Sequence, residues 1–433
     1  MARSSRLFLA GLLVAAALLA GFFLWPPPVP RAAGPMPHEA YVWQRAWTSG
    51  VREAVAGARP TLDGLVALGA EVAWEAGKPR IVRVRVAHEA LRASGLPAGI
   101  ALRIGSFSGP FRAAGDPVEA LADLAAALVR EAAAGGGSPR ELQLDFDCAE
   151  SRLDGYRVWI EAIRRALAPV PVTFTALPSW LDGSAFRRLA AASDGFILQV
   201  HSFERPAGPD ADLSLCDPAA ARRAAERAAR AGVPFRVALP TYGYRVAFDR
   251  SGRFLGLSAE GPRPGWPEDA IVREVAADPA AMADLVRGWT ADRPEAMRGV
   301  LWYRLPVESD ALNWRWVTLK AVREGRTPRP ALRAEARRPQ PGLVEIDLVN
   351  GGDGDATLGG WTVAARWAAR LVASDALDGF ARVAEGPGWM RWGWADRSSP
   401  GRIRAGERRP VAWARLEGDP DGVAALVESA GGR

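Results

Sequence analysis

Asp145 and Asp147 lie two residues apart in the segment 142–150, and Glu150 follows them. Apolar and polar residues alternate in the first part of this segment, so a strand would present both aspartates on one face and its apolar side chains on the other. Two carboxylates held close together raise the pKa of one of them when nothing neutralises it, which suits a proton donor. The spacing therefore predicts acid/base chemistry at the end of a strand.

Strand-like and helix-like segments alternate over most of the chain, which predicts an α/β fold of the (β/α)8 TIM-barrel type. The predicted strands are Ala40–Gln44, Leu65–Glu71, Gly99–Gly105, Glu141–Cys148, Val170–Leu177, Gly195–His201, Phe235–Thr241 and Gly299–Leu305. The predicted helices are Pro117–Ala134, Gly155–Ala168, Ala185–Ala191, Pro218–Ala231, Pro279–Thr290 and a closing helix, Asn313–Arg323. Residues 78–86 are expected to form an extra strand or hairpin beside the second strand. The apolar parity of each strand would lie under the helices, and the acidic pair would point into the barrel near its C-terminal mouth, where active sites of this fold lie.

Several other strands end with polar or aromatic side chains, which predicts a pocket around the acidic pair. The predicted substrate-binding residues are Glu71, Arg103, Gln199, His201, Tyr242, Trp302 and Arg304. Arg103 either neutralises Asp145 on the neighbouring strand or contacts a ligand. His201 is interpreted as a hydrogen-bonded orienting residue, and Trp302 as either a sugar platform or a plug of the barrel. Glu150 is either part of the site or a solvated loop acid.

Charge and motif content narrow the functional classes. The 433 residues are 49% hydrophobic and 24% charged, with a net charge of +6. The positive charge is almost entirely arginine, scattered among acids without a long basic run, so nucleic acid is not a predicted partner. The sequence has no nucleotide-binding loop, zinc signature or Gly-x-Ser-x-Gly elbow, and therefore predicts neither a metal nor a cofactor.

The N-terminal sequence predicts export. Arg3 and Arg6 precede an uninterrupted apolar run, Leu7–Trp25, which reaches the length of a membrane span. The arginines favour a cytoplasmic N-terminus, so the chain is expected to be anchored in the inner membrane and to face the periplasm. The alternative is a signal peptide cleaved near Ala32 and Ala33, which would leave a periplasmic protein.

The two cysteines are Cys148, directly after the acidic pair, and Cys216, in a later loop. Both are expected at the same end of the barrel. In an oxidising compartment such an isolated pair is more often a disulfide than two free thiols, so the sequence predicts a Cys148–Cys216 bond.

The composition changes after about residue 327, where short runs with strand-like alternation begin, such as Leu343–Asn350. They predict a small all-β, sandwich-like module. Its tryptophans are interpreted mainly as core residues rather than as a sugar-binding surface. The predicted organisation is thus an anchor or signal segment at 1–33, a barrel at 34–327 and the β module at 328–433.

Six segments carry a resemblance to a known family: Tyr41–Gln44, Leu142–Glu150, Ala176–Leu181, Leu198–His201, Ala238–Tyr244 and Trp302–Pro306. Together they resemble an exported bacterial family catalogued as the domain of unknown function 3142 family, for which no activity is established. This resemblance covers roughly residues 38–325.

A weaker resemblance is to chitinase-like barrels, which carry Asp-x-Asp-x-Glu at the end of the fourth strand and a tryptophan on the eighth. Asp145, Asp147 and Trp302 match these positions, whereas Ala149 occupies the Glu position and Glu150 comes one residue late. The resemblance implies a glycosidase-like barrel.

The resulting prediction is an exported glycoside hydrolase-like protein that acts on a cell-envelope or extracellular polysaccharide or oligosaccharide by carboxylate chemistry. Asp147 is the predicted principal catalytic carboxylate and Glu150 the acid, with Asp145 as its modulator. His201, Tyr242, Trp302 and Arg304 would position the sugar. Two alternatives stay open: a non-catalytic glycan-binding or envelope scaffold protein with a degenerate site, and a metal-dependent hydrolase that uses the carboxylates.

Overall fold

The computed structural model describes residues 28–75, 78–202, 205–259, 265–395, 401–419 and 422–429. Eight parallel strands form a closed barrel, because the first of them pairs with both the second and the last. In barrel order the strands are β2 (His38–Val42), β3 (Gly64–Glu75), β5 (Ala98–Ile104), β6 (Leu142–Phe146), β7 (Val172–Ala176), β8 (Phe196–Gln199), β9 (Phe235–Pro240) and β14 (Met297–Tyr303). The predicted (β/α)8 barrel is confirmed. The extra strand expected near residue 80 is also present, as β4 (Lys78–Arg83), which pairs antiparallel with β3.

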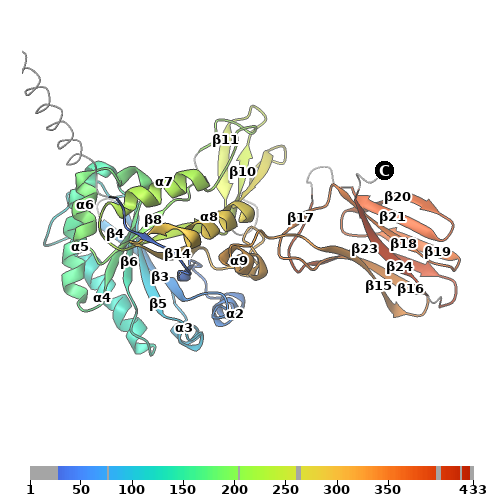
Figure 1. Cartoon of the computed structure of the whole chain (residues 1–433), viewed down its shortest axis with the longest axis horizontal. Coiled ribbons are helices and arrows are strands. Elements are labelled where there is room, and N and C mark those ends of the chain that lie inside the picture. Colours follow the sequence, from blue (N-terminus) through green and yellow to red (C-terminus); the bar gives the residue numbers. More distant parts are fainter. Residues whose placement is uncertain are drawn as a thin grey trace, which may run out of the picture.

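Helices follow the strands and lie around the barrel (Figure 1). They are α2 (Ser49–Ala56), α3 (His88–Ala93), α4 (Val118–Ala134), α5 (Leu153–Leu167), α6 (Ser184–Ala191), α7 (Pro218–Ala229), α8 (Pro279–Ala291) and α9 (Trp316–Arg323). Two of them begin in the same way: Asp217 and Asp278 accept hydrogen bonds from backbone N–H groups of the first turn, and a proline follows each aspartate. The helices α2 and α3 were not predicted; α3 has six residues, too few to give a clear helical periodicity.

The apolar parity of β6 packs against helix α5, as expected. Leu144 and Phe146 are fully buried, and the Phe146 ring lies 5.6 Å from the ring of Trp159 and 5.1 Å from that of Tyr156. Burying an aromatic side chain of this size stabilises the fold by roughly 1.5–3 kcal/mol. This packing fixes the rotation of β6, so that the opposite parity, with Asp145, faces the barrel axis.

A buried ion-pair network lies inside the barrel at the N-terminal ends of the strands. The Arg236 guanidinium contacts Glu39 and donates to both oxygens of Glu141 at 2.6 and 2.7 Å. Gln143 donates to Glu141 at 3.0 Å and accepts from the hydroxyl of Tyr41 at 2.7 Å. Hydrogen bonds therefore connect this network to the level just below the acidic pair.

Three strands that were not predicted follow β9. They are β10 (Gly243–Phe248), β11 (Phe254–Ser258) and β12 (Ile271–Ala276), and they form an antiparallel sheet with β10 in the centre. The sheet projects from the barrel beyond α8 (Figure 1). Smaller elements are β1 (Arg31–Ala32), β13 (Arg293–Pro294) and the short 3₁₀ helices η1 (Glu150–Arg152) and η2 (Pro178–Trp180).

The C-terminal strands form two four-stranded sheets that enclose a second apolar core. One sheet contains β15 (Leu332–Gln340), β16 (Leu343–Asn350), β23 (Arg408–Leu416) and β19 (Leu371–Ala376). The other contains β20 (Phe380–Gly386), β21 (Trp389–Trp394), β18 (Trp361–Arg366) and β24 (Ala424–Ser429), and a small pair is made by β17 (Ala356–Thr357) and β22 (Arg402–Ile403). Trp367 and Trp392 are buried in this core. The predicted C-terminal β-rich part is confirmed, whereas the exact domain boundaries stay a prediction.

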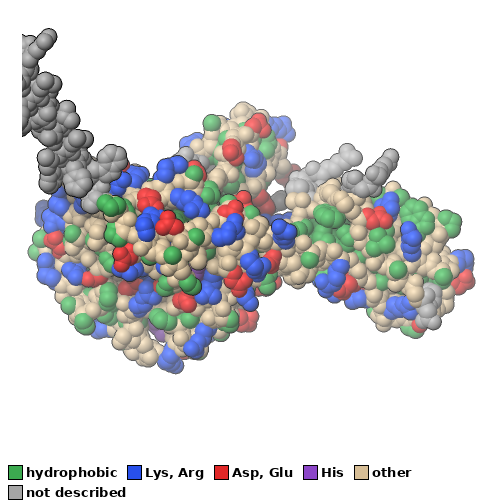
Figure 2. All heavy atoms as spheres, viewed as in Figure 1, with side chains coloured by type: hydrophobic (Ala, Val, Ile, Leu, Met, Phe, Trp, Pro, Cys, Tyr) green, Lys and Arg blue, Asp and Glu red, His purple; other side chains and the backbone are tan. Residues whose placement is uncertain are grey.

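Positive and negative side chains are interspersed over the face of the molecule that Figure 2 shows. Among the described residues, no helix combines the length and the apolar character that a membrane crossing requires. The predicted anchor, Leu7–Trp25, lies outside the described residues.

Candidate active site

A cavity of about 320 Å³ opens at the C-terminal mouth of the barrel. Its lining comes from the ends of β2, β5, β6, β7, β8, β9 and β14 and from the β10–β12 sheet. The described lining residues are Tyr41, Trp43, Arg103, Asp145, Asp147, Thr175, Gln199, His201, Ser202, Ala238, Tyr242, Tyr244, Leu257 and Tyr303. We call it the acid cavity. It brings together six of the predicted site residues: Arg103, Asp145, Asp147, Gln199, His201 and Tyr242.

The two aspartates differ in environment. Asp145 is half-buried and accepts a hydrogen bond from the Thr175 hydroxyl at 2.8 Å, whereas Asp147 is exposed at the mouth. Burial and the neighbouring Asp147 carboxylate raise the pKa of Asp145 to about 6, although Arg103 and Thr175 oppose the rise. Partial desolvation by the cavity walls also raises the pKa of Asp147, again against Arg103. The pair can therefore hold a proton under mildly acidic conditions.

Arg103 is exposed, and the described residues offer its side chain no hydrogen-bond or ion-pair partner. Its charge still lowers the pKa of both aspartates from a distance. Of the two sequence interpretations, direct neutralisation of Asp145 by contact is therefore wrong, because no hydrogen bond or ion pair joins the two side chains among the described residues. The guanidinium stays available to a ligand.

Aromatic side chains form one wall of the acid cavity. The ring of Tyr303 lies 5.3 Å from the His201 ring, nearly parallel to it, 5.2 Å from Tyr242 and 5.6 Å from Trp43. The hydroxyl of Tyr242 lies 3.3 Å from Nδ1 of His201, so His201 is a hydrogen-bonded residue, as interpreted from the sequence. Burial lowers the pKa of His201 to about 4, so this imidazole is neutral at pH 7 and suits a positioning role.

Trp302 does not line the acid cavity, which corrects the sequence prediction. Its side chain is fully buried on the helix side of β14, where Nε1 donates to Nδ1 of His38 at 3.2 Å and the indole lies 6.0 Å from Trp314. The opposite parity, with Leu301 and Tyr303, faces the barrel axis. The parity rule failed on this strand because the interior of the barrel at the level of Leu301 is itself apolar.

Trp43 and Tyr303 are site residues that the sequence argument missed. A signal existed for the first, because Tyr41 and Trp43 share one parity at the end of β2. For Tyr303 the sequence signal was ambiguous. Both faces of its strand are buried, so the alternation of side chains does not show whether tyrosine faces the helices or the barrel axis.

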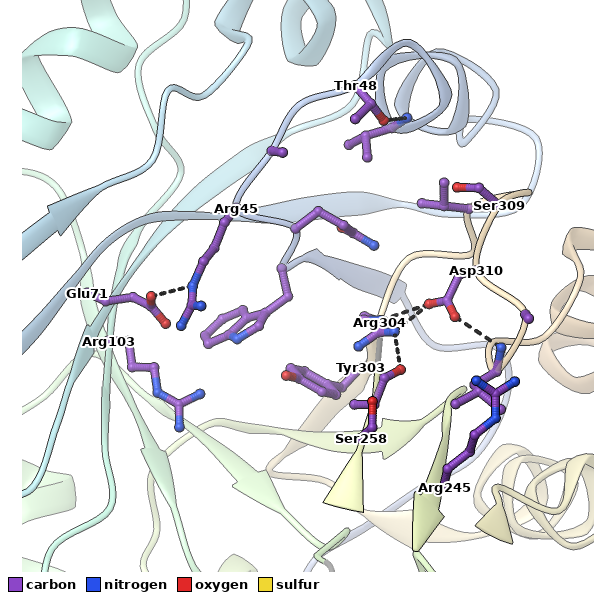
Figure 3. Close-up of a pocket in the computed structure, with 18 residues that line it drawn as sticks. Arg45, Thr48, Glu71, Arg103, Arg245, Ser258, Tyr303, Arg304, Ser309 and Asp310 are labelled. Carbon is purple, nitrogen blue, oxygen red and sulfur yellow. Dashed lines mark hydrogen bonds and ion pairs between the residues drawn. The ribbon is translucent and has the colours of Figure 1, made fainter. Parts of the chain in front are cut away.

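A second cavity of about 690 Å³ adjoins the first and shares Trp43, Arg103 and Tyr303 with it. We call it the basic cavity. Glu71 and Arg304 line this cavity and not the acid cavity. Glu71 pairs with Arg45 at 2.6 Å on one side, and Arg304 pairs with Asp310 on the other (Figure 3).

Glu150 is exposed in the 3₁₀ helix η1 and lines none of the described cavities. Its Oε1 lies 3.0 Å from the position that a Cβ on Gly183 would take, so the carboxylate points toward the loop after β7. The predicted role of Glu150 as the acid is therefore corrected. The cause is local: the strand ends at Phe146, and η1 turns the chain away from the mouth.

Cys148 and Cys216 are both free and buried, so the predicted disulfide is absent. Each thiol packs in the main apolar core as a small hydrophobic side chain, and burial raises the pKa of each to about 12. We expect the unfolded, unreduced protein to take up two alkyl groups per chain in mass spectrometry, the same number as after reduction. Uptake only after reduction would contradict this.

The described residues contain no group of three or more His, Cys, Asp or Glu side chains arranged to hold a metal ion. The described residues therefore offer no cluster of metal ligands that would support the hypothesis of a metal-dependent hydrolase.

No curated protein sequence matches the chain. Solved structures with a similar course of the chain include chitinase ChiA74 from Bacillus thuringiensis, at 10% identity and a TM-score of 0.43, covering 91% of this chain and 100% of that one. The Bacillus cereus spore cortex-lytic enzyme SleL has 11% identity and a TM-score of 0.47, covering 68% and 75%. A C-terminal domain of a putative chitinase from Desulfitobacterium hafniense has 12% identity and a TM-score of 0.47, covering 67% and 99%.

The family model described as Domain of unknown function (DUF3142) matches residues 112–308. The matched segment contains β6 with its acidic pair, and also His201, Tyr242 and Tyr303. The resemblance to this family that the sequence motifs predict is confirmed over these residues.

Proposed function

We propose that this chain is an exported glycoside hydrolase that acts on a cell-envelope or extracellular polysaccharide. The observation that carries the proposal is the pair Asp145 and Asp147 at the mouth of a parallel barrel, in a cavity with an aromatic wall. Glycosidic bonds need a carboxylic acid to protonate the leaving oxygen, and aromatic faces suit the apolar faces of sugar rings. Export rests on the apolar segment Leu7–Trp25.

Asp147 is the group that reaches the substrate, because it is the exposed member of the pair. Its proton passes to the glycosidic oxygen as the bond from that oxygen to the anomeric carbon breaks. Asp145 accepts a hydrogen bond from Thr175. Because two neighbouring carboxylates disfavour ionising together, Asp145 helps the pair to retain one proton. The two groups thus take the roles of acid and modulator without Glu150.

The described lining of the acid cavity has no carboxylate other than the two on and directly after β6. Both therefore approach the sugar from one side, and this lining offers no opposing carboxylate nucleophile. We assign the attack on the anomeric carbon to water or to a neighbouring substituent of the sugar, as in substrate-assisted glycosidases. Either route consumes one water per bond cleaved, and the carboxylate regains a proton from it.

The neutral His201 and the hydroxyl of Tyr242 supply hydrogen bonds to sugar hydroxyls without adding charge near the acid. Trp43 and Tyr303 present ring faces beside them. These residues position the sugar so that the scissile oxygen lies at Asp147.

The experiment that tests the proposal is the release of reducing ends from a panel of envelope polysaccharides and N-acetylated oligosaccharides. A hydrolase shortens at least one of them. A non-catalytic glycan-binding protein, which the absence of a glutamate at Ala149 favours, would retain an oligosaccharide and return it unchanged.

The pH profile provides a separate prediction. Because the reactive form needs a protonated pair, activity should fall as the pH rises through about 6, the pKa of Asp145. Arg103 lowers the pKa of both aspartates, so Arg103→Gln should move this basic limb upward, by up to about one unit given the exposure of the arginine. The measurement is kcat/KM against pH, with Arg223→Gln, an exposed arginine on α7, as the control. A limb that stays in place or moves to lower pH would refute the assignment.

A further inference from the structure

The basic cavity carries an excess of positive charge. Its described lining has four arginines, Arg45, Arg103, Arg245 and Arg304, against two carboxylates, Glu71 and Asp310. Such an arrangement in a hollow attracts anions more strongly than a flat surface would, because the walls focus the field. The function proposed above uses only the effect of Arg103 on the pKa of the aspartates and assigns none of these arginines to a ligand.

Three of the four arginines already form an ion pair with a carboxylate. Arg45 pairs with Glu71 at 2.6 Å, Arg245 pairs with Glu274 at 3.0 Å, and the buried Arg304 pairs with Asp310. These pairs hold the guanidinium groups of the cavity in place, and Figure 3 shows two of them on opposite sides of it.

Arg103 is the exception. Among the described residues its side chain has neither a hydrogen-bond nor an ion-pair partner, and no dashed line reaches it in Figure 3. A guanidinium presents planar donors that match a carboxylate or a phosphate in pairs, and an unpaired one inside a cavity has its full donor capacity left for a ligand.

Arg103 also stands at the junction of the two cavities. It lines both, as do Trp43 and Tyr303. A sugar chain whose scissile bond lies at Asp147 would therefore reach the basic cavity by passing Arg103. An anionic substituent on a sugar next to the cleaved bond would then meet the unpaired guanidinium.

We infer that the basic cavity is a subsite for a negatively charged sugar, whose carboxylate or phosphate is bound by Arg103. This inference rests on the proposed function, because it assigns the substrate class of that same site: an acidic polysaccharide. The paired arginines supply the surrounding positive field, and Trp43 and Tyr303 hold the ring faces.

The test is binding of matched oligosaccharides to the full-length chain carrying Asp147→Asn, which keeps the ligands intact. The carboxylate probe is a hyaluronan hexasaccharide, compared with the same hexasaccharide after reduction of its carboxyl groups. The phosphate probe is pentamannose 6-phosphate, compared with pentamannose. We expect at least one charged probe to bind about tenfold more tightly than its neutral counterpart at low salt.

Arg103→Gln, made in the same background, should remove this preference, and Arg223→Gln should not. The exposed, unpaired Arg103 makes little contribution to folding, so the variant is expected to keep its thermal midpoint. The probe that shows the preference identifies whether a carboxylate or a phosphate is bound.

Equal affinity for charged and neutral probes overturns the inference, and so does an equal loss in the Arg223→Gln variant, which would indicate surface charge alone. The outcome is independent of turnover. A preference for the charged probes in a protein whose parent form releases no reducing ends would support the subsite and contradict the hydrolase.

Discussion

Replacing Asp147 by asparagine is expected to lower the rate of glycosidic cleavage by about 10²- to 10⁴-fold, the usual contribution of a general acid. The exposed Asp147 side chain lines the acid cavity and accepts no hydrogen bond from the described residues, so its removal leaves the packing of β6 unchanged. The loss should appear in kcat, because the neutral amide still occupies the site but has no proton to transfer. Reducing-end release under single-turnover conditions measures it.

Two companion variants make this result specific. Asp123→Asn removes an exposed carboxylate of α4 away from both cavities and should leave the rate unchanged. Asp145→Asn should reduce the rate and move its basic limb, because the remaining Asp147 then titrates without a carboxylate neighbour. A fully active Asp147→Asn variant would contradict the assignment of the acid.

Replacing Arg236 by leucine is expected to destabilise the protein by about 3–5 kcal/mol, the range for a buried ion pair that loses one partner. The side chains of Glu39 and Glu141 are 2% and 6% exposed, and Arg236 contacts both. Burial alone would raise the pKa of Glu141, yet Arg236 and the hydrogen bonds from Gln143 and Thr173 hold it below its ordinary value. Without the guanidinium, two carboxylates would be buried next to each other.

Urea unfolding of the variant and of an Arg223→Leu control measures this effect. A carboxylate with a lowered pKa in the folded state stabilises the protein above its ordinary pKa, here 4.5, and loses that contribution as the pH falls. The difference between parent and Arg236→Leu should therefore be largest near pH 7 and shrink as the pH falls below about 4.5 and Glu141 becomes protonated. An Arg236→Leu protein as stable as the control at pH 7 would show that the network adds nothing.

The barrel could be predicted from the sequence because its strands alternate with helices long enough to show periodicity. The acidic pair could also be predicted. Leu144 and Phe146 are apolar and must face the helices, so Asp145 on the opposite face of β6 must face the barrel axis. The C-terminal sheets followed from alternation alone.

The parts that could not be predicted depend on the environment of single residues. Both faces of β14 are buried, so its parity could not tell Trp302 from Tyr303. The direction of Glu150 depends on a 3₁₀ turn that leaves no periodic signal. Whether two cysteines at one end of a barrel meet depends on loop geometry, which spacing does not determine.

The central claim is that the acid cavity hydrolyses glycosidic bonds through Asp147. The most direct measurement is mass spectrometry of oligosaccharide products formed in H₂¹⁸O by the full-length chain and by its Asp147→Asn variant. We predict one ¹⁸O atom at each new reducing end for the parent and no products for the variant. Oligosaccharides that bind to the parent and return with their chain length unchanged would contradict the claim and identify the chain as a glycan-binding protein.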